Sequence, residues 1–198
     1  MVNYGFFAMP VHPANKNYGT VLRQNREAVI LCDSLGYSEA WIGEHFTSTG
    51  EPIPDPLQFL ASVIAETKSI RLGTAVLNLP LHHPVKLAGQ VAQFDQLSGG
   101  RAMLGIGPGG LRSDLEIFGV PVEDGYFKMV ESVDIMTQLW TSEAPFDIKA
   151  EYWGDVVLKD FIQKDIGLGV QVKPLQNPHP PFAYAMRQPS SGAMTIIV

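Results

Sequence analysis

The stretch Ser98–Gly119, SGGRAMLGIGPGGLRSDLEIFG, decides the fold that this sequence predicts. Ser98-Gly99-Gly100 is a helix stop, because glycine adopts the left-handed backbone that ends many helices. Residues 102–106 form a short uncharged run, which is typical of a strand covered on both faces. Gly105 to Gly110 then leave the strand as a loop with few side chains. Such a loop lets a phosphate or a flat ring lie against bare backbone.

The glycines of this loop have two other interpretations. Gly105-x-Gly107-x-x-Gly110 fits the G-x-G-x-x-G fingerprint of dinucleotide-binding Rossmann folds. That fingerprint belongs after the first strand of its domain, whereas here it follows the fourth expected strand, so the match is weak. The second alternative is a tight turn that binds nothing.

Composition and charge bound the function. The chain has 198 residues, 45% of them hydrophobic, which is enough for one sizeable core. A net charge of −6 without a Lys/Arg cluster argues against nucleic acid and against an anionic membrane as partner. No apolar run has the length of a membrane span, and the first residues lack the pattern of a signal peptide. A single cysteine, Cys32, fits a reducing compartment, so we expect a cytoplasmic protein.

Strand patterns alternate with helical patterns along the chain. The expected strands are residues 4–9, 39–42, 70–77, 102–106 and 182–185; the expected helices are residues 18–35, 57–66, 85–97 and 129–140. This alternation predicts right-handed crossovers and a parallel sheet, closed either as a doubly wound sheet or as a (β/α)8 barrel. We interpret residues 1–198 as a single domain in which residues 146–178 form an inserted loop or hairpin.

Polar and glycine-rich segments follow the ends of the expected strands. They are Glu44-His45, Asn78, Gly107 to Gly110 and Ser190-Ser191. Because chemistry in both candidate folds lies at the carboxyl ends of parallel strands, these segments are expected to meet on one face. No spacing fits a metal site. The acidic residues that follow the glycine loop are interpreted as a solvated face: Asp114, Glu116, Glu123 and Asp124.

Several motifs together resemble the bacterial luciferase-like flavin monooxygenase family. They are Trp41-Ile42-Gly43-Glu44-His45-Phe46 for the family's W-x-x-E-H motif, Arg71 to Leu77 for its third strand, Leu79-Pro80-x-x-His83-Pro84, Phe94-Asp95-x-x-Ser98-x-Gly100-Arg101 and Gly105-Ile106-Gly107. The string GIGPGGLRSDLEIFG is most similar to the limonene-monooxygenase-like branch. Residues from Phe146 onward match only loosely.

The resemblance implies an α/β fold of the TIM-barrel-like (β/α)8 type, of which this chain holds about the first five β/α units. It also implies a homodimer that binds reduced FMN, supplied by a flavin reductase, and uses O2 to oxygenate a small organic substrate. Two alternatives stay open: an F420-dependent oxidoreductase of the same superfamily, and a non-catalytic flavin-binding remnant. Because family members are much longer, we expect a truncated chain or a natural short form.

The resemblance further implies a role for His45 in moving protons beside the flavin. From the residues alone, a structural hydrogen bond is the simpler interpretation of that histidine. Ala75 and Val76 match the position of a non-prolyl cis peptide under the flavin ring, with an ordinary strand as the alternative.

The remaining implied contacts are also to the cofactor. Asn78 would hydrogen-bond the polar edge of the flavin ring, and Gly107 and Gly109 would let the flavin approach the backbone. Ser190 and Ser191 would hold the flavin phosphate through hydroxyl and backbone N–H groups.

Overall fold

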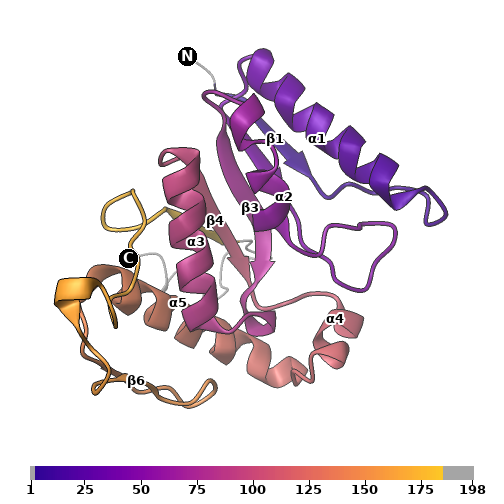
Figure 1. Cartoon of the computed structure of the whole chain (residues 1–198). Coiled ribbons are helices and arrows are strands. Elements are labelled where there is room, and N and C mark those ends of the chain that lie inside the picture. Colours follow the sequence, from indigo (N-terminus) through magenta and orange to yellow (C-terminus); the bar gives the residue numbers. More distant parts are fainter. Residues whose placement is uncertain (1–2, 185–198) are drawn as a thin grey trace.

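The structure is a computed structural model that describes residues 3–184. Its main sheet has five parallel strands in the order β1-β2-β3-β4-β7. The strands are β1 (Gly5–Ala8), β2 (Glu39–Ile42), β3 (Arg71–Asn78), β4 (Ala102–Gly107) and β7 (Phe182–Tyr184). Their carboxyl ends point towards α4 (Arg112–Ile117), which places the expected site at that end (Figure 1).

The order of the strands decides between the two closures. A doubly wound sheet reverses its strand order at a switch point, where its ligand binds. Here each new strand of the main sheet is added next to the preceding one, from β1 through β4 to β7, without a reversal. The doubly wound alternative is therefore wrong, and the order is that of consecutive units of a barrel.

Three long helices and one short helix cover one face of the sheet. They are α1 (Tyr18–Ser34), α2 (Pro56–Ala61), α3 (Pro84–Ser98) and α5 (Gly125–Thr141). Figure 1 shows α2 and α3 in front of β3 and β4, with α5 crossing near the end of α3. The strand residues that face these helices are at most 1% exposed: Ala40, Ile42, Leu72, Thr74, Leu104 and Ile106. On the other face Phe7 is 63% exposed, and Trp41 is partly exposed.

The second helix ends earlier than its hydrophobic pattern suggests. We expected a helix over residues 57–66, but α2 ends at Ala61 and a 3-10 turn follows at Ile64–Glu66. Side chains take the carbonyls that a continuing helix would use: Arg26 donates to the Ser62 carbonyl at 2.8 Å, and Arg101 to that of Ile64 at 3.2 Å. These long-range contacts override the local pattern.

Residues 146–178 leave the alternation of strands and helices. Within them, β5 (Phe146–Ile148) and β6 (Val156–Leu158) pair as an antiparallel hairpin. The loop of this hairpin is held to α5 by Glu131, whose carboxylate accepts the backbone N–H groups of residues 151, 152 and 153. The hairpin therefore packs on the outer layer and not on the main sheet (Figure 1).

A carboxylate near the end of α1 joins that helix to the start of β3. Asp33 accepts hydrogen bonds from the backbone N–H groups of Lys68, Ser69 and Ile70 at 2.8–2.9 Å. Burial alone would raise the pKa of Asp33, but the hydrogen bonds from Ser69, Lys68 and Ile70 outweigh it and lower the pKa from 3.8 to about 2. The contact therefore stabilises the fold while Asp33 is ionised.

We expect Asp33→Asn to lower the free energy of unfolding by about 1–2 kcal/mol at pH 7, after allowance for solvent screening. Because the folded pKa lies below the unfolded one, this contribution is complete above about pH 4 and is lost as the pH falls towards 2. Urea unfolding of the wild type and the variant from pH 7 to pH 3 measures the difference. Asp160→Asn, at an exposed position, is the control; an equal loss in both variants would contradict the prediction.

Candidate functional site

His45 lies three residues beyond β2, at the carboxyl end of the sheet. The loop that begins at this histidine folds back on itself, because the His45 N–H donates to the Ile53 carbonyl at 3.1 Å. A second loop is tied to it, since the His12 N–H donates to the Gly50 carbonyl at 2.7 Å. Backbone hydrogen bonds thus hold the histidine in place before any ligand binds.

Asp114, on α4, is the side chain that orients His45. One carboxylate oxygen, Oδ2, lies 3.2 Å from His45 Nδ1. The other, Oδ1, accepts the N–H groups of Phe46 at 3.2 Å and Thr47 at 2.6 Å, and the Thr47 hydroxyl at 2.5 Å. Because an ionised carboxylate only accepts, its bond to Nδ1 requires a proton on that nitrogen.

The electrostatics of Asp114 favour its charged form. Burial by itself would raise the pKa of Asp114, but hydrogen bonds from Thr47, His45 and Phe46 outweigh this effect, and the pKa lies below its ordinary value. The carboxylate is therefore ionised at neutral pH. It forms a carboxylate–histidine pair of the kind that general acid–base catalysis uses.

The interpretation of Asp114 as part of a solvated acidic face is wrong. Its side chain is only 3% exposed, because α4 turns it inward beneath the loop that carries His45. Glu116 and Glu123 are exposed, in agreement with that interpretation. The pattern of charges along the chain could not distinguish Asp114 from these exposed residues. The signal in the sequence that could have identified it is the position of an aspartate near the start of a short helix after a glycine loop.

A second carboxylate approaches the other nitrogen of the ring. Glu51 Oε2 lies 3.3 Å from His45 Nε2. Within residues 3–184, Nε2 has no hydrogen bond of its own. Exposure of the side chains falls from 30% for Glu51 through 17% for His45 to 3% for Asp114, so Glu51 is the outermost of the three groups.

Glu44 points into a separate buried network. Its carboxylate is 2% exposed and lies 2.7 Å from His82 Nε2, while it also accepts the Asn78 N–H at 2.7 Å. The Asn78 amide in turn donates to the Glu44 carbonyl at 3.1 Å. Asn78 is the residue that we expect at the flavin edge. Its side-chain N–H2 group is used within the protein, whereas its Oδ1 has no hydrogen-bond partner among residues 3–184.

The strand β3 is irregular where the resemblance places the flavin ring. The Ala75–Val76 peptide bond is cis, as the resemblance implies, and the pairing of β3 with β4 shifts register between Thr74 and Leu77. Ala75 and Val76 are partly exposed, whereas their neighbours Thr74 and Leu77 are buried. This part of β3 forms a small accessible apolar edge.

Two glycines of the loop allow close packing against neighbouring side chains of the protein. A Cβ atom at Gly107 would come within 2.7 Å of Val76 Cγ2. Gly109 has a φ of +89°, which favours glycine, and a Cβ there would come within 2.8 Å of Leu115. Close packing of β3 and α4 thus accounts for both glycines, and their contact with a cofactor stays a prediction.

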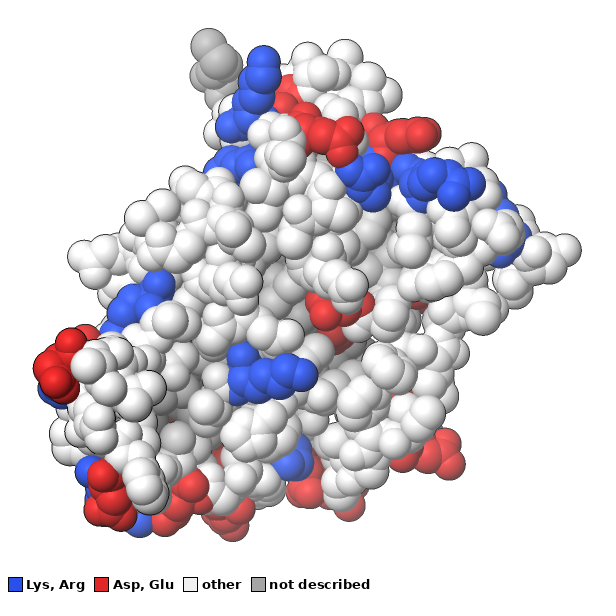
Figure 2. Space-filling view, viewed as in Figure 1, with Lys and Arg blue, Asp and Glu red and all other residues white. Residues whose placement is uncertain are grey.

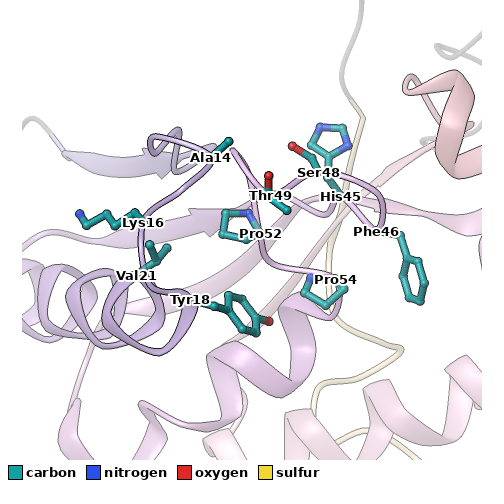
Figure 3. Close-up of a pocket in the computed structure, with 10 residues that line it drawn as sticks. All are labelled: Ala14, Lys16, Tyr18, Val21, His45, Phe46, Ser48, Thr49, Pro52 and Pro54. Atoms are coloured by element: carbon teal, nitrogen blue, oxygen red, sulfur yellow. The ribbon is translucent and has the colours of Figure 1, made fainter.

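Two cavities open near these residues. One, of about 360 Å3, has mostly apolar walls and includes His45, Tyr18, Val21 and Pro52. Figure 3 shows the rings of His45 and Phe46 on opposite sides of their loop. The other, of about 450 Å3, is a hollow beside Glu44 with both apolar and charged residues in its walls. Figure 2 shows this hollow between α2, α3 and α4, with an acidic group inside it and a basic group at its rim.

The donor set and the accessible edge fit a flat ring better than a metal ion. Residues 3–184 contain no cluster of three or more His, Cys, Asp or Glu side chains arranged for a metal. The Ala75–Val76 edge offers a partly exposed apolar surface, and the buried Asn78 follows two residues further along the strand. Ser190 and Ser191, expected at the phosphate, lie outside the described residues. None of the helices within residues 3–184 is long and apolar enough to cross a bilayer.

A singly wound parallel sheet with a carboxylate–histidine pair at its strand ends is typical of an α/β protein of the barrel type. The family model described as luciferase-like monooxygenase matches residues 2–191, so the chain belongs to that family. It is 37% identical over 144 residues to 4-hydroxyprotoasukamycin monooxygenase of Streptomyces nodosus subsp. asukaensis, covering 73% of this chain and 39% of the relative. It is 36% identical to limonene 1,2-monooxygenase of Rhodococcus erythropolis, covering 72% and 37%.

Solved structures agree on the fold. The oxygenating constituent of 3,6-diketocamphane monooxygenase from Pseudomonas putida, in complex with FMN, superposes with a TM-score of 0.85 at 24% identity. That comparison covers 95% of this chain and 53% of the other. F420-dependent enzymes superpose less closely, with TM-scores of 0.67 and 0.69 at 19% identity. The chain spans about half the length of these structures, and they confirm the expected fold. The family model confirms the expected family.

Proposed function

We propose that the protein is a flavin-dependent monooxygenase that uses reduced FMN and O2 to oxygenate a small organic substrate. The observation that carries the proposal is the pairing of His45 with Asp114 at the ends of the strands that also present the Ala75–Val76 edge, in a chain of this family. The named monooxygenases among its relatives support it. FMN in the diketocamphane enzyme favours FMN over F420.

In this proposal the flavin supplies the activation of oxygen, and the protein supplies orientation and protons. The Ala75–Val76 edge would support the flavin ring, and the Asn78 side chain would accept a hydrogen bond from it. His45 holds a proton at Nε2 for the reacting groups, while Asp114 holds Nδ1. Gly107 and Gly109 would border the ring, and Ser190 and Ser191, outside the described residues, would bind the phosphate.

The partners follow from the same relatives. The chain is 31% identical to the oxygenase component of a flavin-dependent trigonelline monooxygenase from Acinetobacter baylyi, which supports a separate reductase as the source of reduced flavin. The apolar cavity beside His45 suits a small, mostly apolar substrate. The proposal also includes a homodimer and a cytoplasmic location. The cytoplasmic location is supported by the one cysteine, Cys32, which is a free thiol.

Replacement of the histidine tests the proposal. We expect His45→Gln to lower the rate of oxygenation by about 10²–10⁴-fold while FMN binds within a few-fold of wild type, because the change removes proton transfer and not the ring's support. The measurement is substrate turnover by the whole protein with a flavin reductase, together with FMN titration. The control is His12→Gln, a histidine whose own side chain contacts Asn25 Oδ1 at 3.3 Å. Unchanged turnover by His45→Gln would contradict the proposal.

The choice of cofactor is tested by binding. We expect the whole protein to bind reduced FMN more tightly than reduced F420 in anaerobic titrations followed by absorbance, and to consume O2 when air is admitted. Tighter binding of F420 without O2 consumption would support the F420-dependent alternative. Binding of FMN without turnover of any substrate in the presence of reductase would support a non-catalytic remnant.

A further inference from the structure

We propose that Glu51 and Asp114 divide the control of His45 between its two ring nitrogens. Asp114 is a positioning residue that keeps the ring proton of the neutral histidine on Nδ1. Glu51 is the group through which Nε2 exchanges protons with solvent. The inference deepens the proposed function and rests on it for its catalytic part, but the state of the histidine ring can be tested without flavin.

Both carboxylate oxygens of Asp114 have hydrogen-bond partners, which supports its role as a positioning residue. Three donors converge on Oδ1 from Phe46 and Thr47, so this oxygen is saturated and the carboxylate cannot rotate freely. Oδ2 is left for His45 Nδ1 at 3.2 Å. The Thr47 hydroxyl is also 2.7 Å from the Ser113 hydroxyl, which adds a second link between the histidine loop and α4. The position of the acceptor beside Nδ1 is therefore built into the fold.

The Glu51 half rests on the shape of the histidine loop. The backbone bond from His45 N–H to the Ile53 carbonyl closes the loop, and the Glu51 N–H donates to the Ser48 hydroxyl at 3.0 Å. These bonds bring Glu51 Oε2 to 3.3 Å from Nε2, on the side of the ring opposite Asp114. At 30% exposure this carboxylate reaches solvent more readily than the ring does.

Other charged groups near the ring are engaged elsewhere. Lys16 lines the same cavity, but its ammonium group bonds Gln24 at 2.5 Å and approaches His12 at 3.4 Å. Figure 3 shows the Lys16 side chain pointing away from the His45 ring. Glu44, although next in sequence, bonds Asn78 and His82. Glu51 and Asp114 are thus the carboxylates within residues 3–184 that contact the imidazole.

The proton balance of the proposed step is simple. The N–H bond at Nε2 of the imidazolium breaks, and its proton passes to an anionic group in the strand-end site. The ring is then neutral, with its remaining proton on Nδ1 facing Asp114. A proton taken from water by the Glu51 carboxylate is passed to Nε2 and restores the imidazolium. One proton moves from solvent to product, and no electron is transferred.

The first test measures the ring tautomer in the flavin-free protein by nitrogen-15 NMR. When the ring is neutral, we expect the wild type to carry the proton on Nδ1. In Asp114→Asn the amide N–H2 group can donate to Nδ1, so we expect the proton to move to Nε2. Thr47→Val is the control: it disturbs the same helix contact without changing the partner of Nδ1. A tautomer that is the same in Asp114→Asn and the wild type would overturn the assignment of Asp114.

The second test addresses Glu51. We expect Glu51→Gln to slow the exchange of the Nε2 proton of the His45 imidazolium with water by about 10-fold or more in the flavin-free protein. In the whole protein with reductase we expect about a 10–100-fold lower kcat, an unchanged FMN affinity, and partial recovery with added small carboxylic acids. Glu51→Asp should recover part of the rate, and exposed Glu123→Gln should behave as wild type.

Wild-type proton exchange in Glu51→Gln would overturn the role of Glu51. If exchange slows and the tautomer shifts as expected while the wild type oxygenates nothing, the inference about the ring stands and the proposed function fails. If turnover occurs but neither NMR readout responds to the variants, the proposed function stands and this inference fails.

Discussion

Gly105→Ala is expected to destabilise the protein by about 3 kcal/mol or more, a large part of the stability of an ordinary domain. A Cβ atom at this position would lie 2.0 Å from the Thr74 carbonyl oxygen and 3.1 Å from its carbon. Both are backbone atoms, so no change of rotamer can relieve the overlap. The same two residues are already joined, because the Thr74 hydroxyl donates to the Gly105 carbonyl at 2.8 Å. Insertion of a methyl group must therefore separate β3 from β4.

Two other glycines provide a graded comparison. A Cβ at Gly73 would come within 2.4 Å of the Trp41 ring, which is a side chain and can shift, so Gly73→Ala should cost less than Gly105→Ala. A Cβ at Gly89 in α3 meets only Gln171 at 3.8 Å, so Gly89→Ala should stabilise by about 0.5–1 kcal/mol. Urea unfolding ranks the three variants. The same unfolding midpoint for Gly105→Ala and wild type would refute the account of this strand pair.

The glycine loop after β4 shows which features of this strand pair the sequence could predict. The strand at residues 102–106 was expected, and β4 runs over Ala102–Gly107. The bare backbone was interpreted as room for a ligand, whereas the space beside Gly105 is taken by β3. The alternative interpretation, a tight turn that binds nothing, did not predict the packing of β3 against Gly105 either. A close approach between two strands far apart in sequence leaves no local pattern, so it could only be seen in the structure.

At the strand ends, too, the sequence could predict where the site residues lie but not which residues they contact. The alternation of strands and helices was sufficient to place His45 and Asn78 on one edge, since parallel strands end together. The partners of these residues were not predictable, because Asp114 is reached across 69 positions and Glu44 turns away from its neighbour in sequence. Consecutive residues of an extended segment point to opposite sides, and only the loop geometry decides which side holds the chemistry.

Glu44→Ala is expected to cost about 3 kcal/mol, because it leaves the buried Asn78 N–H without its acceptor and removes a buried side chain. The truncation leaves the Asn78 N–H and His82 without the acceptor that each has at 2.7 Å, and it leaves a cavity at a side chain that is 2% exposed. Glu44→Gln keeps the shape and one acceptor oxygen, so it should cost less, about 1–2 kcal/mol. Glu66→Ala, which breaks the surface pair with Arg26, should cost less than about 1 kcal/mol.

The position of Glu44 gives it an effect on the site in addition to its effect on stability. It precedes His45 in sequence and holds the backbone of Asn78 at the end of β3, so it sets the spacing between the two strand ends. We therefore expect Glu44→Ala to weaken FMN binding by about 10-fold or more under conditions where the variant is still folded, and Glu66→Ala to bind as wild type. Urea unfolding and FMN titration on the same samples separate the two effects. A Glu44→Ala variant that unfolds early but binds FMN normally would show that the network supports the fold and not the site.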